Sequence, residues 1–412
     1  MTANGIVARG ARTALARAGL VMTCGVILSA GARGQDGSDE IELANMRPVS
    51  NVTIVEDSWK QVCAKKGEGQ VKFDACEVAR VYYDNMPAGF NEGVRRVAGG
   101  YYSKAIEMSF LPLVEKLDGF AKVGGQPFPK QYVLYYLGLA HLRRAAAEDP
   151  KRAREYFKQL LSSVPDTRFI FDAMIGIAES WRIEGRADQA ATEYASAMEK
   201  FEKMAGEVSH KHKMYILRLA RLAELKGIEM LVLQGRHDDA AGKYAQLETK
   251  TQRYNEMTDI TWMARVGSAQ ALVAAGSYRV AIGKCQQMID KGVDSGHTEY
   301  LGGAYMALAD SYFERGKESN DPEDYVFARW NYLRVATLYF EDKTLLLSKA
   351  RYRAGMCYLL LQDNPHEGKN DKVRVATARK RARRQFQQVV RDFPDNEWAD
   401  QAKRELEKLG EG

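Results

Sequence analysis

Residues 134–165 read LYYLGLAHLRRAAAEDPKRAREYFKQLLSSVP, and this stretch decides the fold. Its apolar residues recur every three to four positions, as in amphipathic helices. The small residue Gly138 stands in the first half, and Ala153 with Phe157 one turn later stands in the second. Pro165 follows Ala153 by twelve residues and can end a helix there. We therefore predict two antiparallel helices that approach closely because their facing residues are small.

The same offset recurs five more times along the chain. The matching pairs are Ala190/Tyr194, Ala240/Tyr244, Ala281/Cys285, Ala328/Tyr332 and Ala382/Phe386, preceded by Gly176, Gly227, Gly267, Ala309 and Gly355. In each unit the residue one turn after the alanine would fill the gap toward the next helix pair. A helix pair with an uncovered apolar face stacks on its neighbour, so the sequence predicts a mainly α repeat array.

Leu137-Gly138 with Ala153, Phe157 and Pro165 resembles the pattern of the tetratricopeptide repeat (TPR) family. The resemblance covers most of residues 90–409 and implies a right-handed α-solenoid of about six to seven helix pairs. The family period is about 34 residues, whereas the small residues here lie 38 to 51 residues apart. Longer helices or insertions, such as residues 363–372, are therefore required, and another α-solenoid class with longer repeats remains an alternative.

The first 34 residues predict a cleaved bacterial-type signal peptide. Arg9, Arg12 and Arg17 precede an apolar stretch at 18–32, and no acidic residue interrupts them. We expect cleavage between Ala32 and Gly34, with export to the periplasm or outer envelope; an uncleaved anchor is the alternative. Thr23 before Cys24 fits a lipid-modified cysteine poorly, so a lipoprotein is disfavoured.

Four segments follow from these patterns: a signal peptide at 1–34, a polar linker at 35–50, a small β-rich region at 51–86, and the helical array at 87–412. Alternation at 52–55 and 71–73 around a glycine-containing turn at 66–69 predicts a β-hairpin with a third strand. Residues 396–409 predict a charged cap helix at the end of the array. A short β-rich prefix of this kind resembles those that precede TPR arrays in some exported bacterial proteins.

The net charge gives no general argument for nucleic-acid binding. The chain holds 60 basic and 54 acidic residues, and the four arginines of residues 1–34 leave 56 basic residues against 54 acidic ones. The basic run at 369–384 is the one charge cluster. It favours either a solvated helix face or peripheral contact with an anionic envelope surface.

No catalytic, phosphate-binding or zinc-binding motif stands in the sequence. His210 and His212 lack an acidic or cysteine partner at ligand spacing, so we expect no metal and no cofactor. Cys63 and Cys76 lie close in sequence, and either a disulfide or two separate half-buried thiols is open.

We expect a non-enzymatic protein-protein interaction scaffold of the bacterial envelope, which binds a partner peptide or helix in a concave groove. A self-assembling structural subunit and an enzyme acting on a cell-wall polymer are the alternatives. The family resemblance implies that the first helix of each pair lines the groove. It places there Tyr132, Tyr135, Ile177, Arg221, Glu224, Asp310, Tyr352 and Met356.

Overall fold

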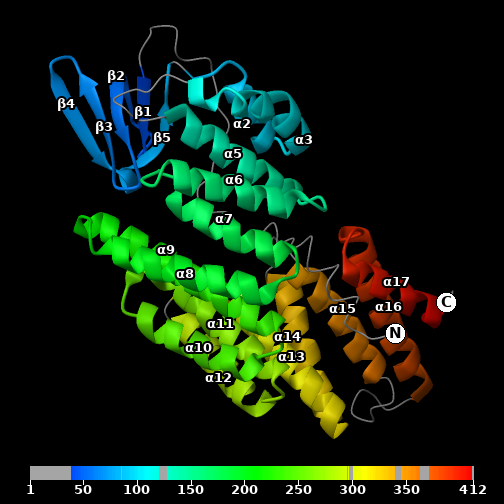
Figure 1. Cartoon of the computed structure of the whole chain (residues 1–412). Helices are drawn as coiled ribbons and strands as arrows, with labels where there is room; N and C mark the ends of the chain where they lie inside the picture. The colour runs from blue at the N-terminus through cyan, green and yellow to red at the C-terminus, as the bar shows by residue number, and fades with distance from the viewer. Residues whose placement is uncertain are drawn as a thin grey trace. The chain divides into compact units, whose positions relative to one another are not determined.

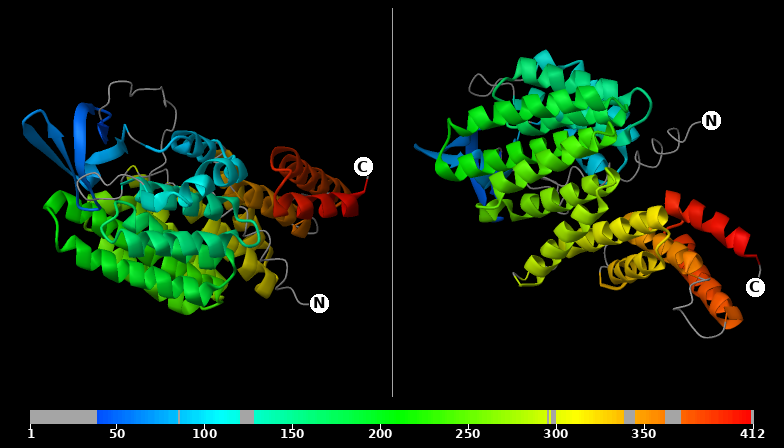
Figure 2. Two further views of the ribbon diagram at one scale, coloured as in Figure 1. Left: turned by 45° about the horizontal axis from the view of Figure 1, so that its top comes forward. Right: turned by 90° about the horizontal axis from the view of Figure 1, so that it is seen from below.

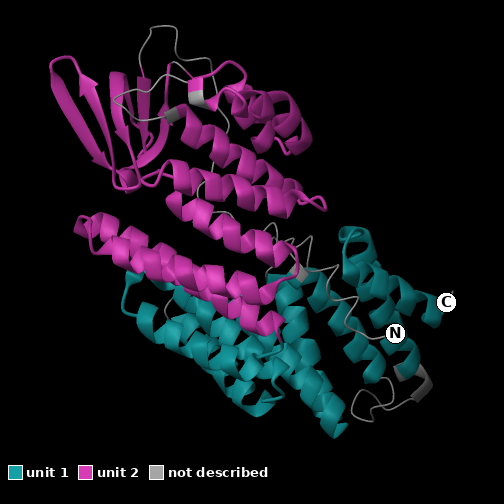
Figure 3. Cartoon of the chain, viewed as in Figure 1, with its two compact units in different colours: residues 1–14, 235–412 teal, residues 15–234 magenta. Residues whose placement is uncertain are grey.

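A computed structural model describes residues 39–84, 86–119, 128–294, 296, 300–338, 345–361 and 371–410. The chain divides into two compact units, of which one spans residues 15–234 and the other residues 1–14 and 235–412 (Figure 3). The predicted signal peptide with Cys24 and most of the predicted insertion at 363–372 lie outside the described residues. Each unit is described by itself below.

The first unit begins with a five-stranded antiparallel sheet in the order β4-β3-β2-β1-β5. Its strands are β1 (Asp39–Leu43), β2 (Pro48–Asp57), β3 (Gln61–Lys66), β4 (Gly69–Asp74) and β5 (Val78–Tyr82), with a 3-10 turn η1 (Ala75–Glu77) before β5. The long strand β2 pairs with β1 and with β3, so it belongs to both halves of the sheet. Gly67, with φ of +58°, closes the β3–β4 hairpin, as predicted.

The sheet is larger than the predicted hairpin with a third strand. Residues 39–43 and 48–50, which the sequence suggested were linker, form β1 and the start of β2. The physical reason is Ile41, which is fully buried although acidic residues flank it. The side chain of Asp39 also satisfies backbone donors, because it accepts hydrogen bonds from the Ile54 and Asp84 amides at 2.8 and 3.0 Å.

The helices follow in sequence order (Figure 1). In the first unit they are α2 (Phe90–Ala98), α3 (Tyr102–Lys104), the π-helix η2 (Ala105–Phe110), α4 (Leu111–Val114), η3 (Leu117–Gly119), α5 (Phe128–Arg144), α6 (Asp149–Ser163), α7 (Ile170–Ile183), α8 (Ala187–Ala205) and α9 (His210–Leu233). In the second they are α10 (His237–Thr251), η4 (Asn255–Met257), α11 (Thr258–Ala274), α12 (Tyr278–Asp294), α13 (Leu301–Ser319), α14 (Pro322–Leu338), α15 (Leu345–Leu360), α16 (Asp371–Asp392) and α17 (Glu397–Leu409).

The predicted repeat register is confirmed. The six small residues fall on the odd-numbered helices from α5 to α15, which we call the first helices. The six alanines fall on the even-numbered helices from α6 to α16, the second helices, and every one of these alanines is fully buried. Helix α17 matches the predicted cap helix, and the Asn396 side chain caps it by accepting from the Ala399 amide at 2.9 Å. The described chain is therefore a helical repeat protein with a small antiparallel sheet.

Glycine on the first helices makes room for aromatic rings on the second helices. A Cβ atom built on Gly138 would lie 2.7 Å from the Phe157 ring, and one on Gly176 would lie 2.4 Å from the same ring. Phe157 therefore occupies space left by glycines of two successive first helices, α5 and α7. The Gly267 and Tyr244 pair and the Gly355 and Phe386 pair repeat this contact at 2.7 and 2.5 Å. These rings are buried and couple neighbouring helices by close packing.

The sheet closes over the N-terminal ends of α5 and α7 through Asp57, the last residue of β2. Figures 1 and 2 show the sheet at one end of the helices α5 to α9, which lie side by side. The Asp57 carboxylate accepts from the hydroxyls of Tyr83 and Tyr132 at 2.7 and 2.8 Å, and pairs with the Arg168 guanidinium at 3.3 Å. The Asp57 side chain is fully buried. Three groups, from Tyr83, Tyr132 and Arg168, thus meet at one carboxylate and tie β2 to the start of α7.

A second junction joins the sheet to the N-terminal end of α9. The Ser209 hydroxyl donates to Asp74 at 2.6 Å, and Lys211 pairs with Glu77 at 2.8 Å. Beneath these polar contacts the Trp59 ring packs 6.4 Å from the His212 ring, and both side chains are buried. The sheet therefore spans the N-terminal ends of three first helices, α5, α7 and α9.

Candidate functional site

Four of the predicted groove residues are buried packing residues. Tyr132 is held in the Asp57 junction, and the Tyr135 ring stacks on Phe169 at 4.0 Å. Ile177 lies in the core of the first unit, and Tyr352 packs against Phe386 in the second. Less than a tenth of each side chain is exposed. They hold helices and the sheet together, and the sheet junction at Tyr132 is what the family register did not anticipate.

The other four predicted residues are half-buried on the first helices. Arg221 pairs with Glu224 on its own helix and with Glu202 on α8. Asp310 accepts from the Tyr332 hydroxyl and pairs with Lys349, both at 2.6 Å. Met356 packs at the edge of the α15 core. These four residues are accessible to a partner, whereas the four buried packing residues are not.

The first helices of the second unit carry two parallel ion pairs. Lys349 on α15 meets Asp310 on α13 at 2.6 Å, and one helical turn further Arg353 meets Glu314 at 3.1 Å. The Arg353 guanidinium also lies 4.4 Å from the centre of the Phe313 ring. The two ion pairs hold α13 against α15 and leave a charged face that is partly open to solvent.

The most distinctive side chains of the first unit are Asp172 on α7 and Tyr215 on α9. Burial raises the pKa of Asp172 to about 6 and that of Tyr215 to about 12. Nevertheless Asp172 is only half-buried, and 37% of Tyr215 is exposed. Part of each side chain is therefore packed against the protein, and the remainder is open to water.

Three further groups act electrostatically on these two side chains. The charge of Arg168 lowers the pKa of Asp172 and opposes the dominant effect of burial. The charges of Arg168 and Arg218 lower the pKa of Tyr215, and the Cys76 thiol raises it. We call Asp172, Tyr215, Arg168, Arg218 and Cys76 the Asp172–Tyr215 patch. It combines an aromatic ring, a carboxyl that titrates near neutrality and the Arg218 guanidinium, a set suited to hydrogen bonding of a polypeptide, while the Arg168 guanidinium is already bound to Asp57.

Sequence reasoning missed this patch for a clear reason. Asp172 stands in the first turn of α7, where an acidic residue normally complements the helix dipole. No motif in the sequence links it to Tyr215, 43 positions later. A weak signal was present in the spacing, because both residues stand near the starts of successive first helices.

The four cysteines within the described residues are free thiols. Cys63 lies on β3 and is buried, and Cys76 lies in η1 and is half-buried, so the possible disulfide between them is not formed. Burial raises the pKa of both thiols, which keeps them in the less reactive protonated form. Within the described residues, no group of three or more His, Cys, Asp or Glu side chains could hold a metal ion.

The basic run is only partly described, from residue 371 onward in α16. Arg379, Lys380, Arg381 and Arg384 are exposed, and Arg383 donates to the carbonyl oxygens of Leu409 and Gly410 at the end of α17. Arg383 therefore has a structural role at the C-terminal end of a helix, where cations are favoured. Among the described helices, none is long and apolar enough to cross a membrane.

Comparisons with known proteins find likeness to solved structures alone. No family model matches the chain, and no curated protein matches it. The solved structure titled as the apo form of RapI is similar at 13% sequence identity and a TM-score of 0.48, over 78% of this chain and 86% of that one.

Proposed function

We propose that this chain is a non-enzymatic scaffold of the tetratricopeptide repeat type that binds a segment of a partner protein. The Asp172–Tyr215 patch carries the proposal. Tyrosine and arginine are the side chains that most often dominate binding energy at protein interfaces. Here Tyr215 and Arg218 stand on the first helix α9, where the family resemblance expects a partner segment, and 37% of Tyr215 is exposed.

The repeat type is supported by the register of small residues and rings. Gly138, Phe157 and Gly176 follow the TPR order, and their contacts explain why glycine is needed at both positions. The repeats are longer than the family period of about 34 residues. Helix α9 alone extends over 24 residues, which accounts for part of the difference.

Export remains part of the proposal, on the basis of Arg9, Arg12, Arg17 and the apolar stretch at 18–32. N-terminal sequencing of the protein purified from its source tests it. The sequence is expected to begin near Arg33 or Gln35. An intact Met1 in the exported fraction would contradict cleavage.

Site-specific photo-crosslinking tests the binding function. A photoreactive phenylalanine derivative replaces Tyr215 in one variant and Ser196, which is exposed on α8, in the control. We expect a discrete product with another protein from position 215 and none from position 196. The additional substitution Asp172→Asn should reduce the yield.

The products also separate the proposal from its alternative. Equal crosslinking from both positions would refute a specific role of the patch. A product made only of two copies of this chain would instead support the self-assembling subunit. Light scattering of the purified mature protein provides the independent measure of oligomeric state.

A further inference from the structure

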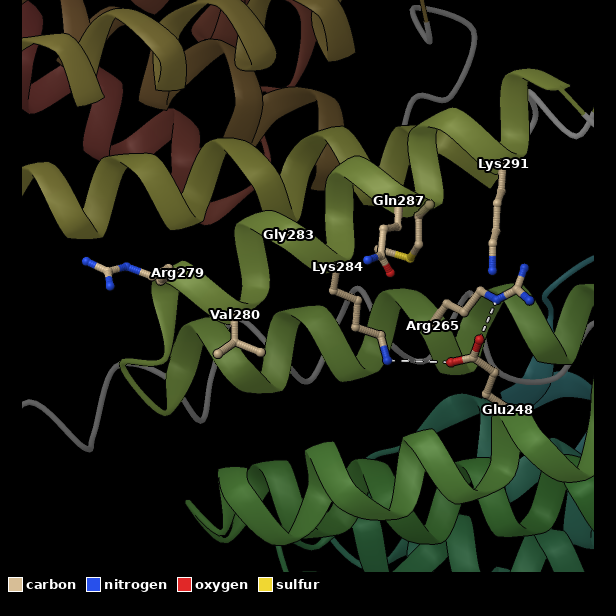
Figure 4. A pocket seen from close by; sticks show the side chains of 9 residues that line it. Glu248, Arg265, Arg279, Val280, Gly283, Lys284, Gln287 and Lys291 are labelled. Carbon is tan, nitrogen blue, oxygen red and sulfur yellow. Dashed lines mark hydrogen bonds and ion pairs between the residues drawn. The ribbon is translucent and has the colours of Figure 1, made fainter.

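A half-open pocket of about 390 Å³ lies in the second unit, between α10, α11 and α12 (Figure 4). Its walls come from Glu248 on α10, Arg265 on α11 and one face of α12 from Arg279 to Lys291. The pocket is separate from the Asp172–Tyr215 patch, because its lining residues all belong to the other unit.

One carboxylate serves two cations in this pocket. Glu248 pairs with the Arg265 guanidinium at 2.8 Å and with the Lys284 ammonium at 3.5 Å. All three side chains are at least three-quarters buried, so water screens their charges only in part. In Figure 4 Lys291 extends toward the same group from the next turns of α12. Arg265, Arg279, Lys284 and Lys291 line the pocket with a single acidic residue, Glu248, so its lining carries more positive than negative charge.

Arg265 is held in place from a second direction. Its guanidinium lies 4.8 Å from the centre of the Trp262 ring, and that ring stacks on Tyr300 at 5.9 Å. A guanidinium fixed by an aromatic face and a carboxylate presents its remaining donors in a defined direction. The geometry suits a planar carboxylate, because the guanidinium fork and the carboxylate oxygens match in spacing.

The pocket also has an apolar side. Val280 is 61% exposed, and Met288 is buried. Gly283 stands between them in sequence, and a Cβ atom built on it would meet no other atom within 4 Å. The missing side chain leaves open space beside the charged group. An apolar side chain could occupy that space while an adjacent carboxylate reaches Lys284 and Lys291.

We propose that this pocket binds an acidic peptide segment in which a Glu or Asp side chain neighbours an apolar residue. Glu248 occupies the position of a bound carboxylate and competes with the incoming one. An acidic peptide fits better than a polyanionic polymer, because a polymer of charged groups would leave Val280 and the space at Gly283 unfilled. The proposal concerns a different surface from the function proposed above and stands independently of it.

Fluorescence anisotropy of the mature protein with a labelled peptide of alternating glutamate and leucine tests this proposal. A peptide with glutamine in place of glutamate is the control ligand. We expect the glutamate peptide to bind at least about tenfold more tightly, since several charge contacts add. Binding should weaken as salt is added.

Three variants are expected to weaken, strengthen or leave unchanged the binding of the same peptide. Replacing both lysines, K284Q with K291Q, should weaken binding about tenfold, whereas E248Q should strengthen it about threefold by removing the competing carboxylate. The matched control is K243Q, which removes a positive charge from the exposed face of α10 outside the pocket. It should change binding less than about twofold. Circular dichroism confirms that each variant is folded.

Several results would overturn the proposal. Equal binding of the glutamate and glutamine peptides would do so without any variant. Unchanged binding after the double lysine replacement, or weaker binding by E248Q, would also do so. Tighter binding of a polyphosphate probe than of the peptide would assign the pocket to a different class of ligand. None of these results would alter the crosslinking expected from Tyr215.

Discussion

The Arg168 guanidinium lies 3.3 Å from the carboxylate of Asp57, although 111 positions separate the two residues. Burial lowers the pKa of Arg168, whereas interactions with Asp57, Tyr132 and Tyr83 raise it. The second effect is larger, so the pKa of Arg168 is raised. The same guanidinium donates to the carbonyl oxygen of Val78 at 3.3 Å. A single side chain at the start of α7 thus fixes both β2 and β5.

Replacement of Arg168 by alanine should destabilise the first unit strongly. The change would leave the buried Asp57 carboxylate without its cation, and breaking a buried pair costs about 3–5 kcal/mol. Chemical unfolding followed by circular dichroism measures the free energy. The control is Glu92→Gln, which removes an exposed pair with Arg95 and should cost less than about 1 kcal/mol. Similar costs for the two variants would contradict the role of the junction.

Two glycines of the same register should respond differently to alanine. Gly176→Ala brings a Cβ atom to 2.4 Å from the Phe157 ring and should cost about 1–3 kcal/mol. At Gly227 the nearest contact of a new Cβ is Tyr194 at 3.5 Å, so Gly227→Ala should be neutral or stabilising by about 0.5–1 kcal/mol.

Unfolding free energies of the two variants test this contrast. Trimming the ring with Phe157→Leu in the Gly176→Ala background should recover part of the loss, because the clash is with the ring itself. Equal effects at Gly176 and Gly227 would show that the space next to Phe157 is not limiting.

Asp172 should make the first unit more stable in acid. Its pKa is about 6 in the folded chain, above the ordinary value of 3.8, so the folded state binds the proton more tightly. This contribution is complete below about pH 4 and is lost as the pH rises through about 6. Asp172→Asn should therefore stabilise the protein by about 1–2 kcal/mol at pH 7 and change little below pH 4.

The control for Asp172 is Glu199→Gln on the exposed side of α8. Unfolding free energies of both variants between about pH 4 and 7 give the comparison. A destabilising effect of Asp172→Asn at pH 7 would mean that the charged form is the favoured one.

His212 should act in the opposite sense. Burial lowers its pKa below the ordinary 6.5, despite the opposing charges of Asp74 and Glu77. Its stabilising contribution is therefore present above about pH 6.5 and is lost as the pH falls through the lower folded pKa. His212→Phe keeps a ring against Trp59 and should reduce the acid sensitivity by about 1 kcal/mol.

The exposed His210 provides the control for His212. His210→Asn should change the unfolding free energy by less than about 0.5 kcal/mol, as is usual for an exposed position. The interpretation fails if His212→Phe has the same pH profile as the parent protein.

The helical part of the fold could be predicted because its signal is local. Ala153 and Phe157 stand one turn apart, and the glycine that receives the ring precedes them by a single helix. The sheet was only partly predictable. Strand β1 is five residues long and mostly acidic, so it carries no alternation that distinguishes it from a linker.

The candidate site was less predictable because it depends on contacts between distant residues. Tyr132 reads as a groove residue by its register, but its hydroxyl is committed to Asp57, 75 positions earlier. From the sequence, Asp172 is an ordinary residue of a first turn, and only the folded chain shows that burial raises its pKa and that it interacts with Tyr215 of α9. The spacing of the repeat pattern locates the first helices, but tertiary contacts decide which of their side chains stay accessible.

The Asp57 junction also sets an order of events during synthesis of the chain. The strands from Asp39 to Tyr82 can pair as soon as they leave the ribosome, since all their partners are nearby in sequence. Gln131 and Arg168, the partners of Asp57, are made 74 and 111 residues later, and His212 later still. The newly made sheet must therefore wait with the Asp57 carboxylate unpaired until Arg168 is made, and its second junction closes only when Ser209 and Lys211 follow.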